Sequence, residues 1–194
     1  MDKICAVVDA QGFYIRNQFL AREVAFVSDT LSHCQEFNPN IKWGELNLKE
    51  SKTVRVTRAR VHGFSLNAYR NKLNIVPESS LMIHYLQQFY KLLASEEKPY
   101  FGVKNVKLKE VLEKAGIPVC DLGLPEFGMP SVTKIEKMYN SDWICAYHTE
   151  ADAQRCALRK CYNLWRYIKT RLYEETNNKD PVSIETLNDA HQSN

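Results

Sequence analysis

The first 27 residues are dominated by short apolar runs rich in β-branched side chains. Residues 3–9 form the first run, which ends at Asp9, and residues 13–15 and 22–27 form two more. Runs of this length separated by a glycine-containing segment predict strands, with a hairpin turn at residues 10–12. A chain that begins with consecutive strands builds a sheet first, and its later helices must cover the faces of that sheet.

The remainder of the chain alternates between helical and extended patterns. Residues 30–52 are polar and are expected to be irregular, and the valines of residues 54–61 alternate with basic residues, which predicts a half-exposed strand with a basic outer face. Helices are predicted at 78–95, 107–115 and 149–172, and short strands at 100–103 and 119–122. This order predicts an α/β fold with a mixed sheet flanked by helices. Residues 1–173 are expected to form one domain and residues 174–194 a polar, disordered tail.

The composition indicates a cellular location but does not indicate a function. The 194 residues carry a formal net charge of only +3, which indicates no particular class of partner. No run of eighteen apolar residues is present, and the N-terminus leads directly into a strand, so neither a membrane span nor a signal peptide is predicted. Six cysteines without a regular framework favour reduced thiols or a metal site over disulfides. We therefore expect a cytoplasmic or nuclear location.

Asp9 is the first candidate functional residue. A carboxylate held at the end of a rigid strand can bind a divalent cation and place it against a phosphate group, as two-metal nucleases do. The alternative is structural, because an acid after a strand often starts a turn. Asp9 is therefore a candidate ligand of Mg²⁺ or Mn²⁺, and other carboxylates are needed to complete such a site.

The order of elements, and short motifs at both ends of the chain, resemble the RNase H-like fold of the DEDD 3′–5′ exonucleases. The start, Asp9-Ala10-Gln11, is similar to the Asp-x-Glu of that family. Glu23 lies in the strand predicted at residues 22–27, where we expect it to be a structural or surface acid. His148 and Asp152 resemble the closing pair of the histidine-type subfamily. The resemblance implies Asp9 and Asp152 as metal ligands and His148 as the base that activates water. A looser resemblance links the chain to insect proteins of viral or transposon origin.

Three departures from the family pattern indicate a degraded active site. Gln11 replaces one of the metal-bridging acids. Asp152 lies one residue closer to His148 than in the family, which rotates it by about 100° on a helix. Between residues 100 and 112, where the middle aspartate of the family is expected, the chain has lysines. With Asp9 and Asp152 alone, a two-metal site lacks the negative charge that it needs.

The last predicted helix has an apolar and a basic stripe. The apolar stripe, which should face the core, consists of Leu158, Cys161, Trp165, Ile168 and Leu172. The basic stripe consists of Arg155, Arg159, Arg166 and Lys169, interleaved with Tyr162 and Tyr173. Arginines pair with phosphates and tyrosines stack on bases, so the stripe is a candidate surface for DNA or RNA. The alternative is a solvated helix face.

A structural zinc site competes for the same segment. Cys145 and His148 have a Cys-x-x-His spacing, and Cys120 and Cys156 supply two further ligands of a type that Zn²⁺ prefers. If zinc binds His148, that residue cannot act as a general base. Two classes of function therefore stay open: a metal-dependent nuclease, and a binding domain without catalysis whose partner is nucleic acid or, with a zinc-braced loop, a protein.

Overall fold

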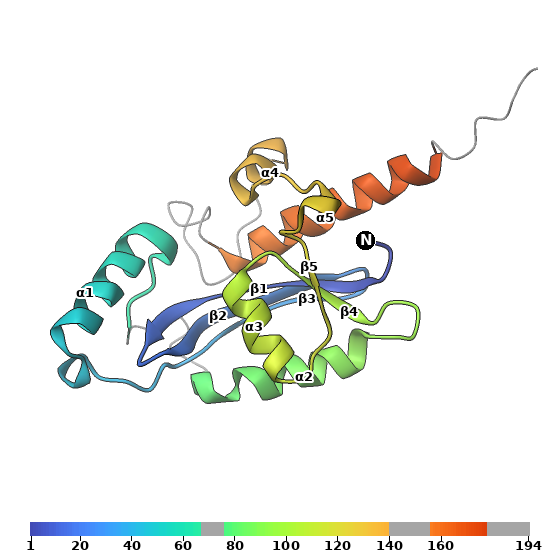
Figure 1. The fold of residues 1–194 in the computed structure, drawn as a ribbon. Coiled ribbons are helices and arrows are strands. Elements are labelled where there is room, and N and C mark those ends of the chain that lie inside the picture. Colours follow the sequence, from blue (N-terminus) through green and yellow to red (C-terminus); the bar gives the residue numbers. More distant parts are fainter. Residues whose placement is uncertain (67–75, 140–155, 178–194) are drawn as a thin grey trace, which may run out of the picture.

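A long β-hairpin forms the middle of the sheet in the computed structural model, which describes residues 1–66, 76–139 and 156–177 (Figure 1). The sheet order is β3-β2-β1-β4-β5. The strands β1, β2 and β3 are antiparallel neighbours, and β4 and β5 run parallel to β1. Their bounds are Ile4–Ile15 (β1), Gln18–Ser28 (β2), Ser32–Glu36 (β3), Tyr100–Val103 (β4) and Val119–Asp121 (β5). This mixed sheet flanked by helices confirms the predicted α/β fold and is consistent with an RNase H-like arrangement.

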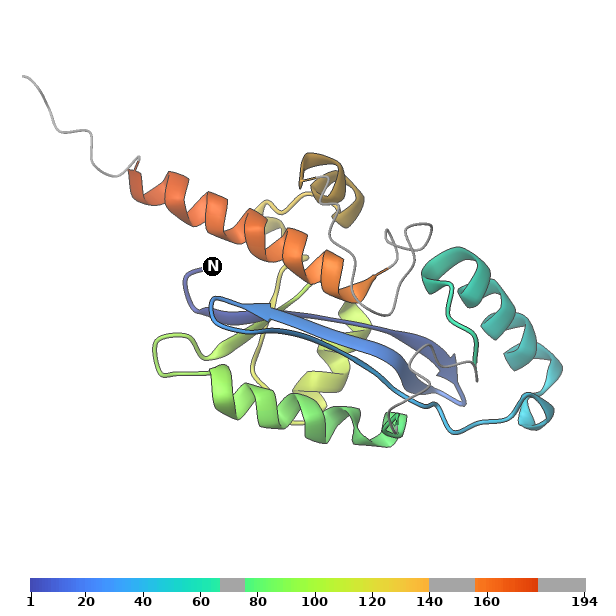
Figure 2. The same cartoon turned by 180° about the vertical axis from the view of Figure 1, so that it is seen from behind.

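Helices cover both faces of the sheet (Figure 1, Figure 2). The long helix α5 crosses one face with α4 beside it, and α2 and α3 lie against the other face, while α1 lies beyond the hairpin end of the sheet. Their bounds are Leu48–Thr57 (α1), Met82–Leu93 (α2), Val106–Lys114 (α3), Val132–Tyr139 (α4) and Ala157–Asn177 (α5). The helices predicted at 78–95 and 107–115 are therefore confirmed within a few residues, and α5 extends past the domain boundary expected at residue 173. Residues 178–194 of the predicted tail lie outside the described residues.

Each face of the sheet carries its own hydrophobic cluster. The cluster under α5 includes Val7, Ala25 and Trp165, and the opposite cluster, under α2 and α3, includes Val8, Phe26 and Leu112. Alternate residues of β1 and β2 therefore point to opposite faces, as in any strand. The predicted apolar stripe of α5 is confirmed, because four of its five residues are buried and the fifth is partly buried against the same cluster.

The hairpin turn is not where the sequence pattern placed it. β1 runs without a break from Ile4 to Ile15, and the turn is formed by Arg16 and Asn17, whose φ angles are 51° and 59°. A two-residue hairpin turn of type I′ requires positive φ at both positions, and Asn adopts that conformation readily. The predicted turn at residues 10–12 is therefore wrong.

Gly12 serves a different purpose. The register between β1 and β2 shifts beside this residue, so that Arg22 is the extra residue of a β-bulge. A Cβ atom on Gly12 would overlap the carbonyl oxygen of Leu20 and lie 2.9 Å from the Cα atom of Ala21. The glycine is needed for this close approach of two backbones.

The strand predicted at 54–61 is also wrong. These residues belong to α1 and to the π-helical turn Arg58–His62 that follows it. Asn47 accepts a hydrogen bond from the amide of Glu50, whose carboxylate accepts one from the amide of Asn47. This reciprocal capping box starts a helix, and it outweighs the β preference of the valines. β3, which lies in the segment expected to be irregular, and α4 were not predicted.

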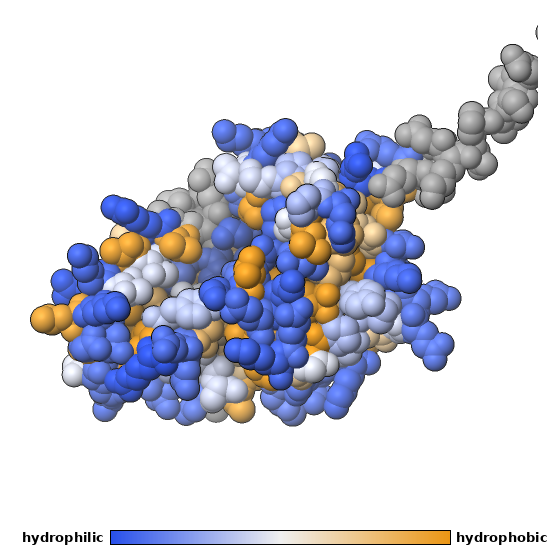
Figure 3. Space-filling view, in the orientation of Figure 1, coloured by the Kyte–Doolittle hydropathy of each residue, from blue (hydrophilic) through white to orange (hydrophobic). Residues whose placement is uncertain are grey.

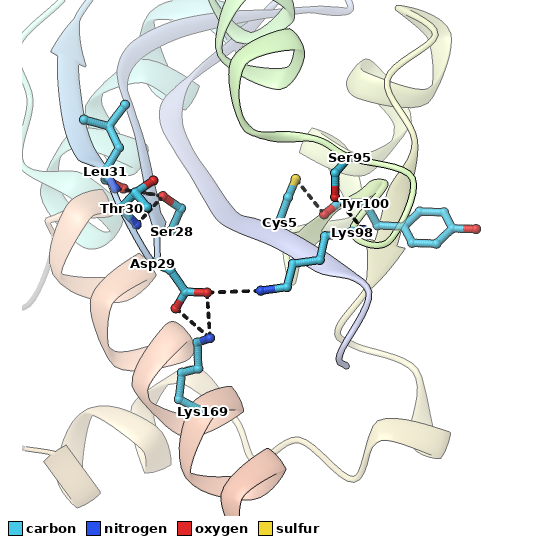
Figure 4. Close-up of polar contacts among 9 residues, drawn as sticks. All are labelled: Cys5, Ser28, Asp29, Thr30, Leu31, Ser95, Lys98, Tyr100 and Lys169. Carbon is cyan, nitrogen blue, oxygen red and sulfur yellow. Dashed lines mark hydrogen bonds and ion pairs between the residues drawn. The ribbon is translucent and has the colours of Figure 1, made fainter.

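Asp29 connects three parts of the fold at the opposite end of the sheet (Figure 4). It lies in the turn after β2, and its carboxylate pairs with Lys98, which precedes β4, at 3.1 Å and with Lys169 of α5 at 2.6 Å. Ser28 stabilises the same turn, since its hydroxyl group accepts a hydrogen bond from the amide of Leu31. Lys169 is thus part of a structural ion pair.

We expect Gly12→Ala to destabilise the protein by about 3 kcal/mol or more, because the new methyl group must displace the backbone of β2. Urea unfolding followed by circular dichroism measures the change. Gly44→Ala is the matched control, since a Cβ atom there would meet nothing within 4 Å. Equal stabilities of the two variants would contradict the described bulge.

Candidate functional site

Asp9 lies within β1, opposite Ala25 of β2, and its side chain is only partly buried. It lines a cavity of about 280 Å³ between the sheet, α4 and α5. The other residues that line this cavity are Val8, Lys104, Asn105, Val132, Lys160 and Leu164. Burial raises the pKa of the Asp9 carboxyl group, and the charge of Lys160 opposes that rise. The Asp9 carboxylate therefore lines a cavity together with Lys104 and Lys160. We call this the Asp9 cavity.

The two lysines reach the Asp9 cavity from different elements. Lys104 directly follows β4, and its ammonium group donates to the carbonyl oxygen of Met129 at 3.3 Å. Burial lowers the pKa of this ammonium group, and the charge of Asp121 opposes the effect. Lys160 lies in the first turn of α5. Next to Lys104, the side chain of Asn105 caps the start of α3. The cavity thus holds one carboxylate and two ammonium groups.

Glu23 is fully buried two residue pairs further along the hairpin, opposite Gln11. Its carboxylate accepts a hydrogen bond from the Cys34 thiol at 3.2 Å and another from the amide of Ala157 at 2.9 Å. Burial raises the pKa of Glu23 to about 7; the charge of Asp9 adds to the rise, and both hydrogen bonds and Lys160 oppose it. Its expected role as a structural acid agrees with this geometry, because it joins the sheet to the start of α5.

Glu136 of α4 is a third carboxyl group close enough to affect Asp9. Burial raises its pKa, an effect that Asp9 strengthens and that Lys160 and Arg159 oppose. Arg159 is half-buried. The result is a mixed cluster of acids and bases between the sheet, α4 and α5, which we call the charged cluster. Its members are Asp9, Glu23, Glu136, Lys104, Arg159 and Lys160.

The described residues of this arrangement do not fit a divalent metal ion. Among the described residues, no three His, Cys, Asp or Glu side chains are placed to hold a metal ion together. Mg²⁺ and Mn²⁺ require several oxygen ligands, and two-metal catalysis requires several carboxylates close to both ions. The Asp9 cavity supplies one carboxylate and two positive charges that repel a cation. The donor set of the described residues therefore does not match the predicted Mg²⁺ or Mn²⁺ site.

Four of the predicted site residues lie outside the described residues: Cys145, His148, Asp152 and Arg155. The predicted approach of Asp152 to Asp9 and the role of His148 as a base therefore stay predictions. The predicted zinc site also stays a prediction. Cys156 is fully buried in the apolar cluster under α5, and Cys120 is partly buried against the same cluster.

The predicted basic stripe of α5 is not a row of free cations. Lys169 pairs with Asp29 and lies 4.9 Å from the centre of the Trp165 ring. Arg166 is exposed, and its guanidinium group lies 4.8 Å from the centre of the Tyr139 ring. Arg159 is half-buried in the charged cluster. Among the three cations of the stripe that the structure describes, only Arg166 and, in part, Lys169 are exposed as the stripe requires. Its contact with nucleic acid stays a prediction.

Lys104, Lys160 and Glu136 were not among the predicted site residues. Lys104 was detectable, because it is one of the lysines found where the middle aspartate of the exonucleases is expected. Lys160 and Glu136 carried no local signal, since each is one charged residue on a helix with several. They meet Asp9 only through the packing of α4 and α5 on the sheet.

No protein-family model matches the sequence, and no curated protein matches it. Among the described residues, no helix is both long and apolar enough to cross a membrane.

The buried Glu23 predicts a specific pH dependence of stability. The folded protein holds the Glu23 proton up to a pKa of about 7, whereas the unfolded chain releases it near the ordinary glutamate pKa of 4.5. Raising the pH through this window therefore lowers the free energy of unfolding, by roughly 3 kcal/mol from this group. In Glu23→Gln, which keeps an acceptor for the Ala157 amide, urea unfolding should show a decline smaller by that amount. Parallel pH profiles of the two proteins would contradict the prediction.

Proposed function

We propose that this chain is a nucleic-acid-binding RNase H-like domain, related to the histidine-type DEDD exonucleases, that acts by binding and not by metal-dependent cleavage. The observation that carries the proposal is that Lys104 and Lys160 line the cavity beside Asp9. The two ammonium groups occupy the surroundings in which a nuclease of this fold needs metal-bound carboxylates. A cytoplasmic or nuclear location is part of the same proposal.

The charges of the Asp9 cavity favour an anion over a cation. Two unit charges 4 Å apart interact by about 4 kcal/mol at an effective dielectric constant of about 20, so one carboxylate does not offset the repulsion of a divalent cation by two ammonium groups. A phosphate group, in contrast, would stabilise the charged form of Lys104, which burial disfavours. The start of α3 next to Lys104 adds a partial positive charge of the same sign.

Asp9 limits this affinity without preventing it. Its own negative charge repels a phosphate, but burial raises its pKa and Lys160 compensates its charge. The exposed Arg166 adds positive charge on α5 outside the cavity. The phosphate backbone of DNA or RNA presents many anionic groups in series, so it can contact both the cavity and Arg166, which a single small anion does not.

Salt-dependent binding of a fluorescent oligonucleotide tests the proposal. We expect Lys104→Gln/Lys160→Gln to weaken binding about tenfold at low salt and to reduce the slope of log K against log salt by about 1.4 to 1.8, since each phosphate contact contributes about 0.7 to 0.9. The matched control is Lys91→Gln/Lys114→Gln, which removes two exposed charges from α2 and α3. Equal binding by both double variants would refute a role of the Asp9 cavity, and absence of binding at low salt would indicate a protein partner.

A nuclease assay with Mn²⁺ tests the absence of catalysis. We expect no cleavage of DNA or RNA above the level of an Asp9→Asn control purified in the same way, because the described residues that line the Asp9 cavity supply one carboxylate, and a two-metal site needs several. Metal analysis of the same samples tests the zinc alternative. Cleavage that depends on Mn²⁺ and disappears in Asp9→Asn would show an active nuclease and refute the proposal.

A further inference from the structure

We infer that α1 and the π-helical turn after it form a second contact for single-stranded nucleic acid, separate from the Asp9 cavity. The inference rests on the proposed function, because it assigns the same class of partner to another part of the molecule. The surface consists of five exposed cationic residues, which we call the α1 basic surface: Lys49, Lys52, Arg55, Arg58 and Arg60.

The α1 basic surface concentrates the positive charge of the chain. Residues 48–62 contain five Lys or Arg residues and one acid, whereas the whole chain contains 26 basic and 23 acidic residues. In the described part of the structure, none of the five cations makes an ion pair. The one acid, Glu50, is half-buried, caps α1 and lies 3.7 Å from Arg16. The surface therefore attracts anions over its whole length.

The surface is held rigidly at the hairpin end of the sheet. Val54 of α1 is fully buried in a cluster with Phe13, Ile15 and Leu66. At the other end, His62 is fully buried: its Nδ1 atom accepts from the amide of Phe64, so its Nε2 atom carries the proton and donates to the carbonyl oxygen of Gly12 at 3.1 Å. Cations on an anchored helix lose less conformational entropy when they bind a partner than cations on a loose segment do.

A cavity beside the α1 basic surface suits one nucleotide. It has a volume of about 360 Å³ and lies between the hairpin turn and the start of α1. Tyr14, Arg16, Asn47 and Lys49 are among the residues that line it. Tyr14 is 40% exposed, and an exposed tyrosine offers a platform on which an unpaired base stacks. Lys49 supplies positive charge for the adjoining phosphate, whereas the charge of Arg16 is partly offset by Glu50, which also lines the cavity.

The exposed apolar side chains of this surface favour single-stranded nucleic acid, because its bases are unpaired and can contact them. Leu48, Val56 and Val61 are exposed between the cations, and Figure 3 shows apolar side chains within a mostly hydrophilic surface at this end of the molecule. Grooves for single-stranded nucleic acid combine cations for the backbone with platforms for bases.

Along β1, Asp9 and Arg16 are roughly 20 Å apart at about 3.3 Å per residue. A strand of about ten nucleotides, with a rise of at least about 3.4 Å each, reaches both sites.

Charge reversal on α1 tests the inference. We expect Lys52→Glu/Arg55→Glu/Arg58→Glu to weaken binding of a fluorescent ten-nucleotide oligo(dT) at least about tenfold and to lower the salt slope by about 2, at 0.7 for each lost contact. The matched control, Lys3→Glu/Lys91→Glu/Lys114→Glu, makes the same change of net charge at exposed positions elsewhere. Equal loss of binding in both triple variants would overturn the inference, because net charge alone would then explain it.

Two further measurements keep the test decisive. If the triple variant unfolds in circular dichroism, Tyr14→Ala replaces it, with Tyr14→Phe as the variant that keeps the stacking ring; we expect about tenfold weaker binding for alanine and near wild-type binding for phenylalanine. Vesicles of phosphatidylserine provide the other arm. Loss of vesicle binding without loss of oligo(dT) binding would overturn the inference in favour of a membrane contact.

The Lys104→Gln/Lys160→Gln variant separates this inference from the proposed function. If that variant binds oligo(dT) normally and the α1 triple variant does not, the α1 basic surface stands and the role of the Asp9 cavity fails. If the wild-type protein does not bind oligo(dT) or a duplex at low salt, both proposals fail together.

Discussion

The contact between the Glu23 carboxylate and the first turn of α5 is the interaction on which the candidate site depends. It attaches the helix to β2 at the place where Asp9, Lys160 and Glu136 are brought together. A buried carboxylate is costly unless hydrogen bonds compensate the lost hydration, and here the Cys34 thiol and the Ala157 amide both donate to it. The price of burial is still visible in a pKa raised to about 7. Residues that are costly for stability and gathered beside a cavity are candidates for function.

Under the proposed function, that cluster would let an RNase H-like sheet bind nucleic acid without cutting it. The fold places an acid of its central strand in a cavity, as a nuclease requires, but the neighbouring positions carry ammonium groups. The same fold can host binding or catalysis, so the charges around Asp9 decide between them. We propose that Lys104 and Lys160 favour a phosphate over a metal ion. The α1 basic surface at the hairpin end of the sheet would then hold a second stretch of the same strand.

The sequence pattern predicted correctly those strands and helices whose start and end depend on neighbouring residues in the chain. β4 agrees with its prediction at both ends, and α3 is stopped at Gly116, which has a positive φ angle as a helix end often requires.

The wrong predictions arose where contacts between distant parts of the chain decide the structure, or where two local sequence signals compete. Gly12 looked like a turn residue, but it is required by the close approach of β2. The capping box of Asn47 was present in the sequence and outweighs the alternating valines. Asp9 was found because it ends an apolar run, whereas Lys160 and Glu136 reach it only through the packing of α4 and α5.

Nuclear magnetic resonance of the ¹⁵N-labelled protein tests the central claim most directly, because it reports on each residue of the Asp9 cavity separately. The amide signals of Asp9, Asn105 and Lys160 are followed while Mn²⁺ or a short oligonucleotide is added. Our account predicts that the oligonucleotide shifts these signals in a saturable way and that Mn²⁺ does not broaden them selectively. Selective broadening of the three signals at low Mn²⁺ concentration, without a response to the oligonucleotide, would show a metal site beside Asp9 and contradict the account.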